Sequence, residues 1–264
     1  MQYPTKSEYV KASQDASDNL DMSTKATDEE LNEAIIDEYG VKYSKDGRKL
    51  LKSPRELNGT YSIKRGTKII CDEAFGRRIS LNHSFLNGLV IPDSVIRIGK
   101  GAFANCSFLR SLVIPDSVTS IGASVFWGCS SLSNFVIPDS VTSIGNRAFH
   151  GCSSLHSLVI PNSVTSIGHG AFEDCSSLSS LVIPNSVTCI EESAFHGCTS
   201  LSSLVIPNSV TSIRNRAFWG CTSLSSLVIP VSVTYIGHHA FANCNLSNTL
   251  RQELSSRFGD KIFW

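Results

Sequence analysis

The chain has 264 residues, of which 41% are hydrophobic and 17% charged, and its formal net charge at pH 7 is zero. This balance argues against a nucleic-acid-binding protein, which normally carries a basic face, and no apolar run reaches the ~18 residues needed to cross a membrane. The first residues lack the basic and apolar regions of a secretory signal. A chain that natively starts at Met1 is therefore expected in the cytoplasm.

Charge is unevenly distributed near the N-terminus. Residues 1–40 contain ten acidic and three basic residues, whereas residues 41–78 contain eleven basic and four acidic ones. Two interpretations remain open. Either these segments attract each other or a shared partner, or they form two solvated faces.

The first 56 residues predict a loose segment followed by a cap. Residues 1–26 are polar and are expected to be flexible. The run Thr27–Glu30 has the pattern of a capping box and predicts a short helix that extends to about Tyr39. Apolar residues on both sides of Lys45-Asp46-Gly47 then predict a hairpin. We therefore expect residues 27–56 to form the N-terminal cap.

Residues 57–245 are built from a 23-residue repeat. One divergent copy precedes seven regular copies that read L-x-S-L-V-I-P-[DN]-S-V-T-S-I-G-x-x-A-F-x-G-C-S-S. A fixed period of this size predicts a solenoid, in which each unit buries its apolar side against its neighbours. The divergent copy is five residues longer than the others, because 28 residues separate Phe75 from Phe103.

Each copy predicts two short β segments and a turn. Leu158-Val159-Ile160 alternates between inward and outward positions and predicts a strand that ends at Pro161. The β-branched run 164–167 predicts a second segment, and Gly168 is expected to bend the chain with a positive φ. The Ala-Phe pair then points inward on a helical turn. Stacked copies would pair their strands in parallel and in register, at ~4.8 Å per coil.

Seven of the nine cysteines occupy one equivalent position per copy. Stacking makes their Cβ vectors parallel, which does not allow neighbouring coils to form disulfides, and paired metal-binding spacings such as C-x-x-C do not occur. We expect a reduced and buried thiol ladder. Its members are Cys106, Cys129, Cys152, Cys175, Cys198, Cys221 and Cys244.

Residues 246–264 predict a C-terminal capping helix and a tail. Leu246, Leu250, Leu254 and Phe258 follow one another at four-residue steps, so that one face of the helix can cover the last coil. Caps at both ends would prevent the edge-to-edge pairing that exposed parallel strands invite. The chain is therefore expected to be a monomer, and a self-associating structural solenoid is the alternative.

Two columns of outward positions are candidate binding surfaces. The position after the Ala-Phe pair carries large amphipathic residues in the middle coils, and tryptophan is enriched at binding hot spots. Packing over neighbouring turns is the competing interpretation of these tryptophans. The candidate partner-binding residues are Trp127, His150, Glu173, His196 and Trp219. The outward valine of each strand is a second candidate surface, or simply reflects β propensity.

The column of candidate residues does not predict a metal site. Equivalent atoms of His150 and His196 are separated by roughly 10 Å if two steps of ~4.8 Å lie between them, which is too far for two ligands about 2 Å from one ion. Catalytic motifs are also missing, because nearly every polar residue recurs at the repeat period and forms no unique constellation. The sequence predicts no enzyme, no cofactor and no metal site.

The repeat resembles a known family. The unit L-x-x-L-x-I-P-x-S-V-T-x-I-G-x-x-A-F-x-x-C-x-x-L is similar to the leucine-rich repeats of the BspA-like, treponemal type over about residues 57–246, and the flanks at 43–47 and 257–263 are similar to end pieces of such proteins. This resemblance implies a β-rich, right-handed leucine-rich repeat solenoid with a parallel β-sheet on its concave side. It implies a binding role toward a protein or a glycan, and adhesion at the cell surface as the alternative to a cytoplasmic location.

Overall fold

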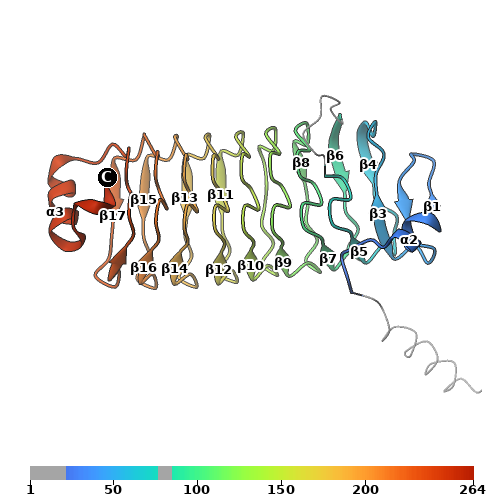
Figure 1. Ribbon diagram of the computed structural model, residues 1–264, viewed down its shortest axis with the longest axis horizontal. Helices are drawn as coiled ribbons and strands as arrows, with labels where there is room; N and C mark the ends of the chain where they lie inside the picture. The colour runs from blue at the N-terminus through green and yellow to red at the C-terminus, as the bar shows by residue number, and fades with distance from the viewer. Residues whose placement is uncertain (1–21, 77–84) are drawn as a thin grey trace, which may run out of the picture.

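The computed structural model describes residues 22–76 and 85–264, which form a β solenoid of stacked coils. Figure 1 shows the coils lying side by side from the N-terminal cap to the C-terminal helix, which closes the far end. One buried phenylalanine marks each coil along this axis: Phe75, Phe103, Phe126, Phe149, Phe172, Phe195, Phe218 and Phe241. The predicted β-rich repeat solenoid is confirmed.

The strands fall into two columns, one on each of two β faces. The first β face consists of β4 (Gly59–Ser62), β6 (Leu86–Val90), β8 (Ser111–Leu112), β11 (Ser157–Val159), β13 (Ser180–Val182), β15 (Ser203–Val205) and β17 (Ser226–Val228). The second β face consists of β5 (Ile69–Ile70), β7 (Arg97–Ile98), β9 (Ser120–Ile121), β10 (Ser143–Ile144), β12 (Ser166–Ile167), β14 (Cys189–Ile190), β16 (Ser212–Ile213) and β18 (Tyr235–Ile236). The strands are short because each coil must turn again after a few residues.

Neighbouring strands pair in parallel at the repeat spacing. Leu158 pairs with Leu181 on the first β face, and Ile167 pairs with Ile144 on the second. Between β5 and β7 the spacing is 28 residues, since Ile69 pairs with Arg97. The predicted five-residue insertion therefore falls between β5 and β6, a stretch that includes residues 77–84, outside the described part of the chain.

The inward positions form one core along the solenoid axis. Phe172 stacks on Phe149 and on Phe195, with ring centroids 5.2 and 5.4 Å apart. Beside this stack, the Cys175 thiol donates a hydrogen bond of 3.2 Å to the carbonyl oxygen of Phe149 in the preceding coil. Burial raises the pKa of the Cys175 thiol well above its usual range. All nine cysteines are free and the seven ladder thiols are buried, which confirms the predicted thiol ladder.

The prediction of a positive φ at Gly168 is wrong. The left-handed conformation lies two residues later, at Gly170 with a φ of 58°. A Cβ added at Gly168 would instead lie 2.5 Å from Oδ1 of Asn146, which accepts a 3.0 Å hydrogen bond from the His169 amide. Glycine is thus needed at position 168 because the neighbouring coil approaches closely. The segment that follows contains separate hydrogen-bonded turns in place of a continuous helix.

The N-terminal cap contains α2 (Asp28–Asn32), β1 (Ile35–Ile36), β2 (Lys42–Tyr43) and β3 (Lys49–Lys52). The capping box at Thr27 and Glu30 is present, but the helix ends well before the predicted Tyr39. The β-branched pair that follows the helix forms β1 and pairs with β2 in an antiparallel arrangement. Asp37 accepts hydrogen bonds from the backbone amides of Tyr39 and Val41 in the turn between these strands. The predicted hairpin forms between β2 and β3, and β3 pairs in parallel with β5.

The acidic and basic segments meet in this cap. Lys49 is 4% exposed, and its Nζ lies 2.9 Å from Oε1 of Glu30. Near the surface, Lys45 Nζ lies 3.8 Å from Oε2 of Glu33. Within the described residues, attraction between the two segments is therefore realised by at least these two ion pairs.

The C-terminal cap consists of α3 (Asn248–Phe258) followed by a 3-10 turn, η1 (Asp260–Ile262). Leu254 is buried, and Leu250 and Phe258 pack against the core, as predicted for a helix that covers the last coil. The tail also provides hydrogen-bond partners for the backbone of the last coil, since the Phe241 amide donates to the carbonyl oxygen of Ile262 at 2.9 Å. Among the described residues, no helix combines the length and hydrophobicity needed to span a bilayer.

Candidate functional site

The five candidate residues form a continuous ladder across five coils, centred on Glu173. Its Oε1 lies 2.9 Å from Nδ1 of His196 in the next coil, and its Oε2 lies 3.4 Å from Nδ1 of His150 in the preceding coil. Both histidines therefore turn toward one carboxylate that sits between them. We call the set Trp127, His150, Glu173, His196 and Trp219 the aromatic–acid ladder.

The two tryptophans end the ladder and pack on its histidines. The Trp219 ring stacks on His196 at a centroid distance of 4.9 Å, and the Arg216 guanidinium lies 5.3 Å from the same ring. Trp127 lies 6.1 Å from His150 in a tilted arrangement. Both tryptophans are half-buried, so packing against neighbouring turns already occupies part of each ring.

Electrostatics favour the charged form of Glu173. Burial by itself raises the pKa of this carboxyl, but the hydrogen bond with His196 and the positive charges of His150, His196 and Arg147 outweigh that effect. The net result holds the pKa of Glu173 below its usual range. The centre of the ladder thus holds an anionic group between two imidazoles.

Two ladder residues, His150 and Glu173, also form a group with the neighbouring Asp174 that could hold a metal ion. One ligand atom each from His150, Glu173 and Asp174 lies within 4.8 Å of the other two.

A second surface, which we call the valine face, is formed by the outward valines of the first β face. Most follow or end a strand whose neighbouring leucine points inward, as at Leu158 (3% exposed) and Val159 (71% exposed). In the coil of Val136 the inward neighbour is Phe135, and the backbone forms only an isolated bridge at Asn134. From Ser111 onward, the outward position two residues before each valine is serine or asparagine, so these outward positions carry no charge between Ser111 and Val228. The valine face consists of Val90, Val113, Val136, Val159, Val182, Val205 and Val228, which are 53–79% exposed.

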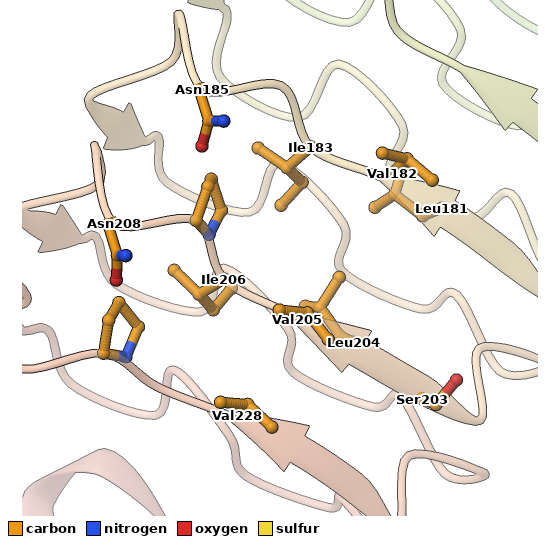
Figure 2. Close-up of a pocket in the computed structure, with 12 residues that line it drawn as sticks. Leu181, Val182, Ile183, Asn185, Ser203, Leu204, Val205, Ile206, Asn208 and Val228 are labelled. Atoms are coloured by element: carbon orange, nitrogen blue, oxygen red, sulfur yellow. The ribbon is translucent and has the colours of Figure 1, made fainter.

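A shallow groove runs beside the valine face, and Figure 2 shows its C-terminal part. Val182, Val205 and Val228 lie along one side, on β13, β15 and β17, and Asn185 and Asn208 project from the turns on the other side. Isoleucine and proline side chains lie between them. A similar hollow borders Val90, Val113 and Val136 at the other end of the face. The turn position that carries Asn185 and Asn208 is aspartate in the N-terminal coils, at Asp93, Asp116 and Asp139.

Sequence reasoning missed one exposed aromatic pair at the N-terminal end of the solenoid. Phe85 is 55% exposed and Phe108 is 37% exposed, and their ring centroids are 4.9 Å apart. Phe108 stands where the next two copies carry Ser131 and Ser154. That departure from the repeat was the available signal.

Parallel strands at a fixed 23-residue spacing, inward leucines and isoleucines, and caps at both ends define a leucine-rich repeat solenoid. More particularly, the chain belongs to the BspA type leucine rich repeat family, whose model matches residues 68–165 and 142–264 with six copies. Proteins of this repeat family generally act through interactions with other proteins.

Solved structures with the same fold come from several bacteria. A leucine-rich repeat protein from Bacteroides ovatus is 31% identical, with a TM-score of 0.69, over 81% of this chain and 55% of that one. The T. pallidum leucine rich repeat protein is 24% identical, with a TM-score of 0.60, over 88% of this chain and 95% of that one. The chain thus spans about half the length of the Bacteroides ovatus protein. Among curated proteins, none matches the sequence.

Proposed function

We propose that this chain is a non-enzymatic scaffold that binds a protein partner along the valine face. The observation that carries the proposal is the uninterrupted row of outward valines, each more than half exposed, on strands whose outward side chains are uncharged. Contiguous exposed apolar patches on soluble proteins mark interaction sites. The partner would present a neutral, apolar strip that fits the groove beside the valines.

The chemistry of the face favours a protein over a glycan. Sugar recognition relies on exposed aromatic rings together with convergent polar groups, whereas the valine face offers branched aliphatic side chains and serine hydroxyls. The half-buried rings of Trp127 and Trp219 lie in the ladder, outside the valine column. The Phe85–Phe108 pair would contribute an aromatic anchor for a protein at the N-terminal end of the face.

We expect the aromatic–acid ladder to contribute less to partner binding than the valine face. Trp127 and Trp219 already contact histidines of adjacent coils, so each has less ring surface left for a partner than an exposed tryptophan would. We expect a Trp127→Ala, Trp219→Ala double variant to weaken partner binding less than changes on the valine face do.

Site-specific photo-crosslinking tests the proposal. A photoreactive amino acid would replace Val182 on the first β face or, as the matched control, the exposed Thr188 in the same coil beside the second β face. Incubation with an extract of the source cells should give one discrete covalent adduct from position 182 and none from position 188. Equal labelling at both positions would contradict a specific valine-face site, and an adduct between two copies of this chain would favour a self-associating solenoid.

The family resemblance supports adhesion at the cell surface as the setting of this interaction, and a cytoplasmic setting is the alternative. Protease treatment of intact source cells separates the two. Digestion of the native protein on unbroken cells would place the partner outside the cell, and protection until lysis would place it inside.

A further inference from the structure

We propose that the centre of the aromatic–acid ladder is a binding site for a divalent transition-metal ion, with Zn²⁺ as the ion tested. The ligands would be Nδ1 of His150, one carboxylate oxygen of Glu173 and one of Asp174. The three residues come from two adjacent coils, and one ligand atom of each lies within 4.8 Å of the other two. The proposal is independent of protein binding on the valine face.

The types of ligand suit zinc. Imidazole nitrogen and carboxylate oxygen bind Zn²⁺ at about 2.0–2.2 Å, and three protein ligands leave one position for water or another ligand. Nδ1 of His150 already lies 3.4 Å from Oε2 of Glu173, close to the separation of two ligand atoms on one tetrahedral ion. Asp174 is exposed, so an ion can enter from solvent.

An unsatisfied nitrogen points to the same place. Nδ1 of His150 is buried and has no hydrogen-bond partner, although it faces the Glu173 carboxylate. Buried polar atoms are nearly always hydrogen-bonded, so an exception marks a place where an ordered water or an ion can bind. A metal ion between His150 and Glu173 would satisfy this atom.

The proposed site does not require His150 and His196, which lie two coils apart, to bind the same ion, because only His150 is a ligand. His196 would act as a positioning residue. Its Nδ1 lies 2.9 Å from Oε1 of Glu173, which fixes the carboxylate while Oε2 faces His150. Outer-shell hydrogen bonds of this kind orient metal-binding carboxylates.

Backbone conformation holds Asp174 in place. Its φ is 58°, a left-handed value that aspartate and asparagine adopt more readily than most residues. A Cβ at Gly197 would lie 2.3 Å from Oδ1 of Asp174, so glycine in the next coil leaves room for this carboxylate. Asn105 occupies the equivalent position above Gly128 with the same geometry. An Asp174→Asn variant should therefore fold normally while losing its charge.

Calorimetric titration of the full chain with Zn²⁺ in reducing, metal-free buffer tests the proposal. We expect one equivalent to bind. His150→Ala and Asp174→Asn should each weaken binding by about 100-fold or more, and His196→Ala by about 10–100-fold, the usual cost of losing an outer-shell group. Asp139→Asn and His238→Ala change an exposed carboxylate and an exposed histidine elsewhere, and should leave the affinity unchanged.

Three results would overturn the assignment. These are no zinc binding by the unmodified chain, unchanged affinity in both His150→Ala and Asp174→Asn, and loss of binding in His238→Ala, which would move the ion to the His238–His239 pair. Cobalt provides a second readout: a Co²⁺-loaded chain should lack thiolate-to-cobalt charge-transfer absorption, and the appearance of that band would assign the ion to cysteine instead. Circular dichroism of each variant confirms that it is folded.

Discussion

The phenylalanine stack gives the sharpest prediction about stability. Phe172 is 0% exposed and stacks on both sides, at 5.2 Å from Phe149 and 5.4 Å from Phe195, with interplanar angles of 7° and 3°. Core Phe→Ala changes cost about 3–5 kcal/mol, and each stacked pair contributes about 0.5–1.5 kcal/mol beyond its buried area. We expect Phe172→Ala, which removes two stacked pairs, to lower the free energy of unfolding by about 4–8 kcal/mol.

The comparison variant is Phe241→Ala in the last coil. Among the described rings, Phe241 stacks on Phe218 alone, at 5.4 Å, so its loss should cost about 0.5–1.5 kcal/mol less. Urea unfolding followed by circular dichroism measures both changes. Thermal melting should show a lower Tm for Phe172→Ala by roughly 8–32 °C, at about 2–4 °C per kcal/mol for a chain of this size. A loss below about 2 kcal/mol for Phe172→Ala, or a larger loss for Phe241→Ala, would refute the view that a continuous stack supports the solenoid.

Three further predictions concern close approach, pH and thiol reactivity. Gly168→Ala should destabilise the chain by about 1–3 kcal/mol. Gly122→Ala, whose Cβ would meet no atom nearer than 3.5 Å, should be nearly neutral. Equal urea midpoints for the two variants would contradict the explanation that the neighbouring coil approaches Gly168 too closely for a Cβ. Because the pKa of Glu173 is lowered in the folded chain, its stabilising contribution is present above the usual glutamate pKa of about 4.3 and is lost as the pH falls through the folded-state value. Unmodified protein should therefore lose more Tm on acidification than Glu173→Gln, and parallel pH profiles would argue against this effect. Half-buried Cys189 should react first with a thiol reagent and the eight buried thiols only on unfolding, so rapid labelling of several cysteines in the native chain would contradict the buried ladder.

The fold was predictable because the same sequence pattern recurs in every copy of the repeat. Alternation at Leu158–Ile160, the strand stop at Pro161 and the cysteine position each recur with the same period, so the parallel register followed from spacing alone. The local role of Gly168 was not predictable, since it depends on an asparagine side chain in the neighbouring coil. The early end of α2 was missed for a similar reason: β1 forms only where β2 is available to pair with it.

The candidate site was predictable as a set of residues but not as a geometry. The column identifies Trp127 through Trp219 as neighbours, yet side-chain rotation decides that both histidines turn toward Glu173. The proximity of Asp174 to His150 and Glu173 was also hidden, because it depends on the left-handed backbone at Asp174 and on the position of the neighbouring coil. Exposure of the valines followed from alternation, whereas the groove beside them depends on how the proline turns stack.

The most direct test of the proposed function compares two charged surfaces on one scaffold. With the partner identified by crosslinking, its affinity would be measured for a Val182→Glu, Val205→Glu variant and for a Thr188→Glu, Thr211→Glu control. All four positions are exposed, so each variant should keep the fold. The valine-face account predicts a loss of at least about 30-fold for the first variant, equivalent to roughly 2 kcal/mol, and little change for the second. Unchanged binding by the valine variant, or a loss confined to the threonine control, would contradict it.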